Sequence, residues 1–287
     1  MEKDGIVRKH NALARAQWQP ATIMEGRLLA ATLAQISPAD EDFREYVVDV
    51  AQIVSDPAAL GGRRSKQVAR AVREAQRRQI TFRDGRQEIH ASLFSHVRYV
   101  YGERKVYVSF DPILKPYYLQ LKKHYTEYSL LEFVQLRSTY SQRLFEYLAS
   151  WNEKDEIVVP IEELHELMQI PDSYRKSYVD FRKRILDQAH KEITSETSLK
   201  YEWEPIRYKR KIVAIRFIFS RKKVEAKKAE KREKKEQKER QNSSKRHNEI
   251  FLAAVNCYNA CGQSCKRDKS PDVCSICERL IRPRSSK

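Results

Sequence analysis

Glycine is scarce in this chain of 287 residues, which contains only seven glycines. Neither G-x-G-x-x-G nor G-x-x-x-x-G-K-[ST] occurs, so no glycine-rich loop is available to cradle a nucleotide phosphate. A G-x-S-x-G pattern and a paired-carboxylate site are also missing, and the seven histidines are scattered singly. These absences argue against an ATPase or a dinucleotide-dependent enzyme, and we predict that the protein is not an enzyme.

Long apolar runs are missing as well. No segment reaches the length of a transmembrane helix, and the N-terminus lacks the apolar core of a signal peptide. We therefore expect a soluble protein that has no membrane partner and stays inside the cell.

Positive charge is in excess, with a net charge of +17 that is spread unevenly. Residues 221–287 contain 20 basic and 9 acidic side chains, so this segment holds +11 and the first 220 residues hold +6. Residues 221–246 have almost no apolar side chain and cannot form a core, which leaves a solvated helix or a disordered chain. We expect the tail to bind polyanions without sequence preference.

Residues 161–219 have the pattern of helix, turn, helix and basic hairpin. An amphipathic helix is predicted over 161–168, and Pro171 lies in the break before a longer helix over 172–193. Alternating strands over 199–203 and 212–219 then flank a basic hairpin tip. A helix that can enter a groove beside a basic hairpin is typical of a winged-helix DNA-binding domain.

The longer helix has one apolar face and one charged face. At about 100° per residue, Phe181, Ile185, Ala189 and Ile193 share a face, and the charged residues point the other way. Such charges are often only a solvated helix surface. Their clustering with the basic hairpin favours DNA binding instead.

The candidate DNA contacts fall into three groups. Base-edge contacts are predicted for Arg175, Lys183 and Arg184, whose cationic groups can pair with guanine. Phosphate contacts are predicted for Lys176 and for the cations of the hairpin, Arg207, Lys209, Arg210 and Lys211. Ser177 with Asp180 can cap the start of the helix, where the backbone amide groups favour a phosphate oxygen. Tyr208 packs either on a sugar or at the strand end.

An earlier part of the chain has the same order of elements. A strand over 45–50 is followed by two helices, over 51–60 and 65–79, which Gly61 and Gly62 separate. A three-stranded meander over 80–82, 89–101 and 106–110 completes it. Between the two copies we expect a connecting helix over 112–123 and a longer helix from a cap at Ser129 to Trp151.

Three segments resemble the iteron-binding plasmid replication initiators. They are Asp-Pro-Ile-Leu-Lys-Pro-Tyr at 111–117, Ser-Thr-Tyr-Ser-Gln-Arg-Leu-Phe-Glu-Tyr-Leu at 138–148, and Tyr-Val-Asp-Phe-Arg-Lys-Arg-Ile-Leu-Asp-Gln-Ala-His-Lys-Glu-Ile at 178–193. The resemblance covers residues 6–220. It implies two winged-helix domains that bind direct repeats in double-stranded plasmid origin DNA as a monomer and repress their own gene as a homodimer.

The resemblance also implies roles for particular residues. Tyr140, Arg143 and Leu144 would be structural, and the helix with Lys183 and Arg184 would lie in the major groove. The first domain would mediate dimerisation and contact the other end of each repeat, through Arg63, Arg64, Lys66, Arg70 and Arg73. For Arg77 and Arg78, the alternative to a DNA contact is a position on a solvated helix surface. A host replication initiator and the replicative helicase would be partners in the bacterial cytoplasm.

We therefore predict an α+β protein with two tandem winged-helix domains, a charged linker and a small tail. The boundaries are 1–118 for the first domain, 119–220 for the second, 221–248 for the basic linker and 249–287 for the tail. All five cysteines lie in this tail, and a reducing cytosol disfavours disulfides. A zinc ion bound by Cys261, Cys265, Cys274 and Cys277, with Cys257 as the substitute ligand, would let the tail fold. Free thiols are the alternative. No cofactor is needed for DNA binding.

Two other functions stay open. A plain winged-helix transcriptional repressor would bind a lone inverted repeat, whereas an initiator would bind several direct repeats of about two helical turns. A rolling-circle initiator that nicks DNA would need paired metal-binding histidines and a reactive tyrosine, but Tyr140 reads more simply as a core residue.

Overall fold

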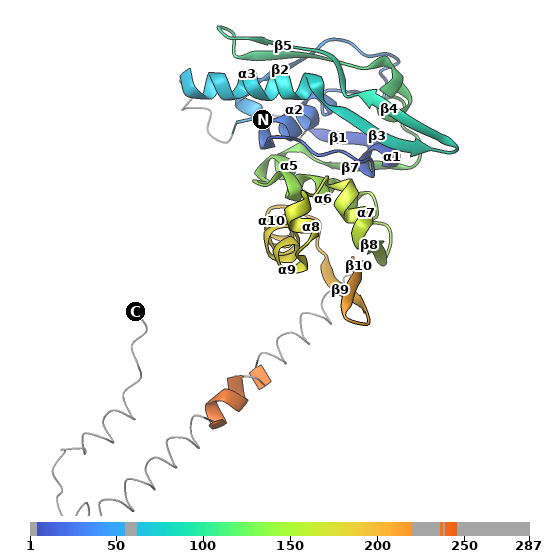
Figure 1. The fold of residues 1–287 in the computed structure, drawn as a ribbon. Helices are drawn as coiled ribbons and strands as arrows, with labels where there is room; N and C mark the ends of the chain where they lie inside the picture. Colours follow the sequence, from blue (N-terminus) through green and yellow to red (C-terminus); the bar gives the residue numbers. More distant parts are fainter. Residues whose placement is uncertain (1–4, 55–61, 220–235, 238, 246–287) are drawn as a thin grey trace, which may run out of the picture. The chain divides into compact units, whose positions relative to one another are not determined.

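The computed structural model describes residues 5–54, 62–219, 236–237 and 239–245, with only the backbone for 62–65 (Figure 1). The chain divides into two compact units, residues 1–224 and 225–287. Nearly all described residues belong to the first unit, which contains both winged helices. Within the described residues, no helix is long and apolar enough to cross a membrane.

The first winged helix, residues 46–110, is built on a three-stranded antiparallel sheet in the order β2-β6-β5. Its strands are β2 (Tyr46–Asp49), β5 (Phe94–Val100) and β6 (Lys105–Phe110). Val48, Val106 and Val108 are fully buried, because residues two apart in a strand face the same side. Helix α3 (Gly62–Arg77) packs against β5, and α2 (Ile23–Leu33) packs against α3 and β2.

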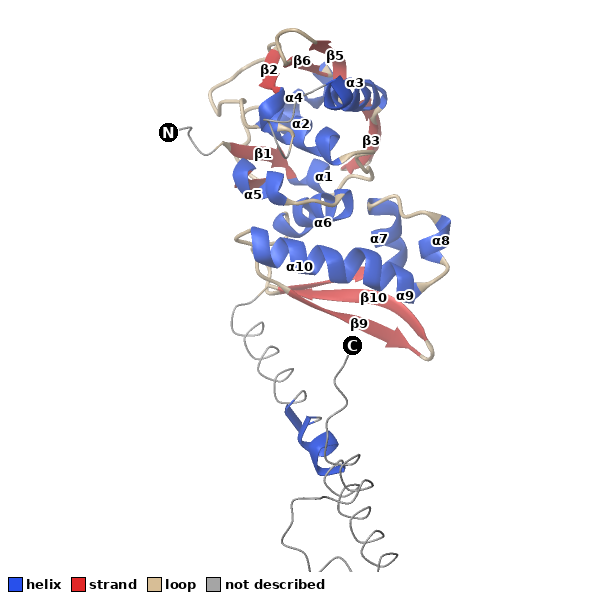
Figure 2. Ribbon diagram, turned by 90° about the vertical axis from the view of Figure 1, so that its left-hand side faces the viewer, coloured by secondary structure: helices blue, strands red, loops and turns tan. Residues whose placement is uncertain are grey.

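The second winged helix, residues 156–218, has the same sheet topology, with strands in the order β8-β10-β9. Its elements are β8 (Glu156–Pro160), α7 (Ile161–Leu167), α8 (Asp172–Arg175), α9 (Tyr178–Phe181), the π-helical η4 (Arg182–Leu186), α10 (Asp187–Glu196), β9 (Glu202–Tyr208) and β10 (Lys211–Ile218). Figure 2 shows α10 lying over one face of this sheet. Phe181, Ile185, Ala189 and Ile193 are all buried, which confirms the predicted apolar face.

The first winged helix contains a hairpin that the second lacks. Strands β3 (Gln79–Asp84) and β4 (Gln87–Ser92) form a two-stranded sheet of their own, while β5 pairs with β6. The predicted three-stranded meander is therefore wrong, because the segment expected as one strand over 89–101 divides at Leu93. The Leu93 side chain is buried and its N–H donates to the Arg78 carbonyl at 3.1 Å, so the chain leaves one sheet for another there.

Residues before and between the winged helices form a third group of elements. These are β1 (Ile6–His10), α1 (Asn11–Ala14), η3 (Pro112–Leu114), α4 (Lys115–Tyr118), β7 (Tyr125–Ser129), α5 (Leu130–Gln135) and α6 (Thr139–Ala149). The N-terminal segment is thus a strand, and β1 pairs antiparallel with β7. Figure 1 shows α5 and α6 between the two winged helices. Helix α6 packs against α2 on one side and against α10 of the second winged helix on the other. One apolar core therefore runs through both winged helices.

Three helix predictions differ from the structure in extent. The connecting helix expected over 112–123 ends at Tyr118, because Leu119 has an extended backbone. The helix expected to reach Trp151 is broken at Leu136, whose extended backbone carries its side chain into the core. Of the helix expected over 51–60, only the short η1 (Val50–Gln52) is described, and residues 55–60 lie outside the described part.

A buried ionic cluster joins β1 to α6. The Glu146 carboxylate accepts hydrogen bonds from Lys9, from the Tyr128 hydroxyl at 2.7 Å and from Arg143 at 2.8 Å. Arg143 also donates to the carbonyl oxygens of Ala16 and Trp18, at 2.7 and 3.0 Å. Although burial opposes it, the charges of Lys9 and Arg143 hold the pKa of Glu146 below its ordinary value. Arg143 and Leu144 are thus structural, as the resemblance implied.

Candidate nucleic-acid interface

The helix predicted to read DNA begins later than expected. Residues 172–175 form the separate helix α8, and the continuous helix runs over 178–196, which we call the reader helix. Its start is set by Ser177, which has an extended backbone and whose hydroxyl accepts from the Asp180 N–H at 3.3 Å. The predicted cap at Ser177 is therefore confirmed. Because Ser177 has an extended backbone, α8 and the reader helix are separate helices, and Lys176 is the last residue before the break.

The middle of the reader helix is π-helical, over Arg182–Leu186. A π-helical turn holds an extra residue compared with an α-helical turn, and such turns are frequent at functional sites. Here the consecutive residues Arg182, Lys183 and Arg184 are exposed, while Ile185 and Leu186 are both buried. The π-helical turn thus presents three adjacent cations on the outer face of the helix.

Two of these cations have further contacts. The Arg182 guanidinium forms an ion pair with Asp187 at 3.2 Å and lies 6.0 Å from the ring centre of Trp203. The Arg184 guanidinium lies 5.9 Å from the ring centre of Tyr174 in α8. These contacts hold both side chains outward from the helix, where they can reach an anionic ligand.

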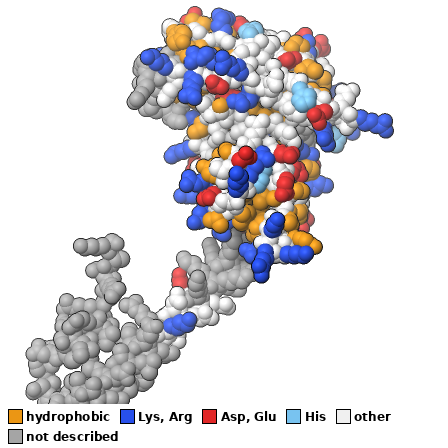
Figure 3. Space-filling model, viewed as in Figure 1, with side chains coloured by type: hydrophobic (Ala, Val, Ile, Leu, Met, Phe, Trp, Pro, Cys, Tyr) orange, Lys and Arg blue, Asp and Glu red, His pale blue; other side chains and the backbone are white. Residues whose placement is uncertain are grey.

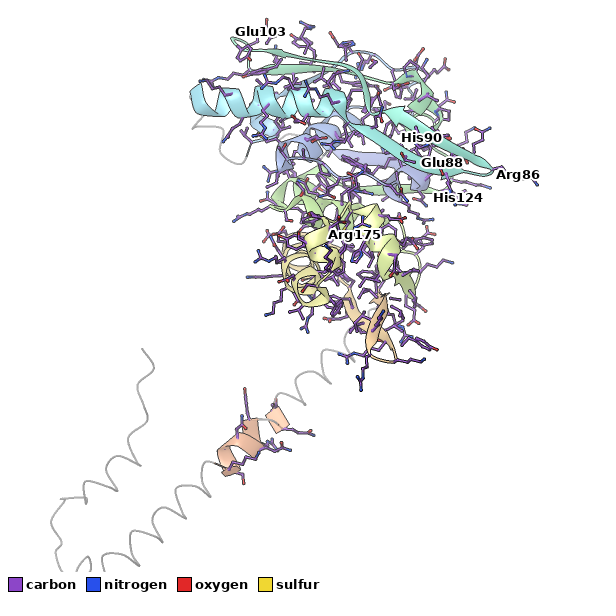
Figure 4. All side chains as sticks on the ribbon, viewed as in Figure 1. Arg86, Glu88, His90, Glu103, His124 and Arg175 are labelled. Atoms are coloured by element: carbon purple, nitrogen blue, oxygen red, sulfur yellow. The ribbon has the colours of Figure 1, made fainter. Side chains whose placement is uncertain are left out.

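Arg175 occupies a more structural position than its neighbours. Its guanidinium donates to the carbonyl oxygens of Ile170 at 2.7 Å and His165 at 3.3 Å, which ties α8 to the end of α7. Burial and the nearby Arg175 charge lower the pKa of His165, whose ring packs edge-on against Phe181. Figure 4 shows Arg175 beside these helices. A base contact by Arg175 stays a prediction, and the described hydrogen bonds give the side chain another role.

The wing is the hairpin formed by β9 and β10. The first strand begins at Glu202, later than the predicted 199, and it continues to Tyr208, well past the predicted 203. Only Lys209 and Arg210 therefore form the turn, and Lys209 has a left-handed backbone with φ 52°. All five predicted wing residues, Arg207, Tyr208, Lys209, Arg210 and Lys211, are exposed. The Tyr208 ring is 65% exposed, so it does not pack at the strand end and is available to a sugar or base.

Helix α3 presents a second row of cations. Lys66, Arg70 and Arg73 are exposed at helical spacing, while Val68 and Val72 are buried. Arg77 continues this row and is exposed. Arg63 and Arg64 belong to the same helix, but their side chains lie outside the described residues. The solvated alternative for Arg78 is wrong, because its guanidinium pairs with the buried Glu25 carboxylate at 2.8 Å.

A groove of about 860 Å³ connects the two rows of cations. Arg70 of α3, Arg137 of the segment before α6, and Arg184 of the reader helix all line it. The buried Arg27 also lines this groove, and its pKa is lowered by burial and then by the charge of Arg137. One predicted contact residue from each winged helix, Arg70 and Arg184, therefore borders the same groove.

The surface view agrees with this distribution. Figure 3 shows Lys and Arg side chains over α3 and again at the tip of the β9–β10 hairpin. The tip of the extra hairpin carries Arg86, which points into solvent in Figure 4.

Sequence reasoning missed three exposed arginines, namely Arg86, Arg137 and Arg182. The Asp84-Gly85 turn pattern could have predicted a hairpin with Arg86 at its tip. Arg182 stood next to two predicted contacts. Nothing local in the sequence marks Arg137, which joins the site through the packing of α6 against the reader helix.

The predicted zinc ligands are not part of the described structure. Cys257, Cys261, Cys265, Cys274 and Cys277 all lie outside the described residues, so a zinc site there stays a prediction. Among the residues that are described, no group of three or more His, Cys, Asp or Glu side chains is placed to hold a metal ion.

Two sheets of the same topology, two outward cationic helices and a basic wing define a tandem winged-helix DNA-binding protein. The family models agree and carry the description further. Residues 6–149 match the model described as "Initiator Replication protein, WH1", and residues 160–219 match "Initiator Rep protein, WH2". The chain belongs to the family of initiator replication proteins. The resemblance and the fold class predicted from the sequence are thereby confirmed.

The chain is also similar to solved structures. One is titled "Crystal structure of Pi initiator protein in complex with iteron DNA", with a TM-score of 0.61 at 17% identity, covering 77% of this chain and 100% of that chain. A structure of RctB domains 2-3 matches with a TM-score of 0.37 at 11% identity, covering 71% of this chain and 83% of that chain. The domain boundary predicted between residues 118 and 119 stays a prediction. The match to the first family model ends at residue 149, and the match to the second begins at residue 160.

Proposed function

We propose that this protein is a plasmid replication initiator that binds directly repeated origin DNA with both winged helices. The observation that carries this proposal is the groove lined by Arg70, Arg137 and Arg184. It lies between α3 and the reader helix, so one duplex can contact cations of both winged helices. The Pi initiator, which shares this fold, was solved bound to iteron DNA.

Footprinting on DNA that flanks the gene tests the proposal. Several protected direct repeats, each about two helical turns long, are expected because two linked modules span more than one turn. A lone protected inverted repeat would instead indicate a transcriptional repressor.

The proposed initiator acts without catalytic turnover. It recruits a host replication initiator and the replicative helicase, and opens the duplex beside the repeats by bending it. A supercoiled plasmid with the repeats, incubated with the protein and a divalent metal ion, should remain unnicked. Nicked circles that require the protein would assign it to the rolling-circle class.

We further propose that the protein represses its own gene as a homodimer formed through the first winged helix. The two corresponding hairpins differ in charge and apolar character. The β9–β10 tip is strongly cationic, whereas the β5–β6 hairpin carries Tyr101, which is 62% exposed, and the adjoining sheet face carries Val47, which is 40% exposed. A Tyr101→Glu variant should sediment as a monomer at concentrations where the natural chain dimerises. An unchanged dimer would exclude this face.

The wing is expected to supply affinity without sequence preference. Lys209→Ala removes one exposed cation at the hairpin turn. The variant should bind cognate and random DNA more weakly by similar factors, and the salt slope of log K should fall by about one. Filter binding at several salt concentrations measures both quantities.

The matched control for the wing is Lys105→Ala, which removes an exposed lysine from the corresponding β5–β6 hairpin. Its salt slope should equal that of the natural chain. If Lys209→Ala changed the preferred sequence, the wing would read bases rather than phosphates.

A further inference from the structure

An exposed valine stands in the first turn of the reader helix. Val179 is 57% exposed and belongs neither to the core nor to the half-buried residues packed against it. Its β-branched side chain is a weaker helix former than alanine or the straight-chain residues. Neither packing nor helix propensity therefore accounts for a valine at this position.

The place of Val179 on the helix faces away from the protein. It lies four residues before Lys183, on the same face, and roughly opposite the buried Phe181. Its neighbour Asp180 donates its N–H to the Ser177 cap, which places Val179 at the leading end of the helix. In helix-turn-helix docking, the N-terminal residues of the second helix are the ones that reach base edges.

The chemistry of the side chain restricts what it can recognise there. Two methyl groups cannot make hydrogen bonds with the donors and acceptors of a base edge. The apolar feature that the major groove presents is the 5-methyl group of thymine. Contact between the valine and this methyl group favours a T·A pair over a C·G pair at one position.

We propose that Val179 is a specificity-determining residue that contacts the 5-methyl group of one thymine in the origin repeat. This inference rests on the proposed function, because it requires the reader helix to enter the major groove of the repeat. Lys183, one turn later on the same face, is then placed over a neighbouring base pair.

Replacing each thymine of the footprinted repeat in turn by deoxyuridine tests the proposal, since this change removes only the methyl group. At one thymine, the full natural chain should lose about fourfold in affinity, the value of one buried methyl-sized group. The Val179→Ala variant should bind the unmodified repeat about as weakly as the natural chain binds that deoxyuridine repeat. The variant should then be indifferent to the same substitution.

Val158→Ala is the matched control. Val158 is 51% exposed, lies on β8 of the same winged helix and is outside the reader helix. This variant should respond to deoxyuridine as the natural chain does. Unchanged affinity of Val179→Ala for random DNA and an unchanged circular dichroism spectrum would show that the variant is folded.

Two results would overturn the inference while leaving the proposed function intact. In one, the natural chain prefers the repeat but no deoxyuridine substitution weakens it. In the other, the sensitive thymine stays sensitive in Val179→Ala. If the natural chain bound the repeat no better than random DNA, the proposed function itself would fail and the inference with it.

Discussion

Glu146→Gln is expected to lower the free energy of unfolding by about 3–5 kcal/mol, because it leaves two buried cations without their carboxylate. Lys9 and Arg143 are 1% and 0% exposed, and both donate to Glu146. Glutamine keeps the size of the side chain and can still accept from Tyr128, so the loss isolates the charge. Urea denaturation followed by circular dichroism measures this loss as a lower urea midpoint with an unchanged m-value.

Glu127→Gln is the matched control on the same pair of strands. Glu127 on β7 pairs with Arg8 on β1 at 2.9 Å, but these side chains are 41% and 34% exposed. Solvent screens such a pair, and the loss should stay below about 1 kcal/mol. Similar losses in the two variants would mean that the buried cluster contributes no more than a surface pair.

The loss caused by Glu146→Gln should depend on pH. Burial lowers the pKa of Lys9 from 10.5 to about 8 even beside the carboxylate, and removal of Glu146 lowers it further. The unfolded chain therefore binds more protons than the folded chain between these two values, so the stability contributed by this group rises with pH through that window. We expect the deficit of the variant to be larger at pH 6 than at pH 9. A deficit that grew with pH would contradict the assignment.

Lys183→Ala and Arg184→Ala should each weaken binding to the cognate repeat by roughly 1–3 kcal/mol and relax its specificity. Both side chains are exposed on the π-helical turn, and neither has a buried role that its removal would disturb. Arg184 also lines the groove, so its loss is expected to affect contact on the side that faces α3. Competition binding with repeats changed at single positions measures both effects.

Lys191→Ala provides the control for these substitutions, because Lys191 is an exposed lysine further along the same helix. It should change cognate binding by much less. Equal losses on cognate and random DNA for Lys183→Ala or Arg184→Ala would assign those residues to phosphate contacts instead.

Local sequence patterns predicted those features that depend on neighbours in the chain. The Thr22 hydroxyl accepts from the Glu25 N–H at 3.2 Å, a capping contact between residues three apart. Ser129 likewise accepts from the Glu132 N–H at 3.4 Å. The helix predicted over 161–168 was found within about one residue of its predicted ends, because helical periodicity acts over a few residues.

Features that depend on distant residues were predicted poorly. Nothing near the N-terminal segment in the sequence marks a pairing partner, yet β1 pairs with β7 more than 100 positions later. The strand expected over 89–101 ran through a change of sheet at Leu93, since alternation continues on both sides of it. Periodicity alone does not show that Arg143 is buried, because the Trp18 carbonyl that it contacts lies on a distant segment; only the resemblance implied its structural role.

The sequence by itself determined that two copies of one plan exist, which helix has a cationic face beside an apolar one, and that the wing of the second copy is basic. These follow from periodicity, turn residues and charge, which are local properties of the chain. Only the tertiary structure decided that Arg175 ties α8 to α7, and that Arg70, Arg137 and Arg184 border one groove. It also left Val179 exposed at the leading end of the reader helix. These positions depend on how α6 packs against other elements. Packing between segments that are distant in the chain cannot be predicted from any short stretch of sequence.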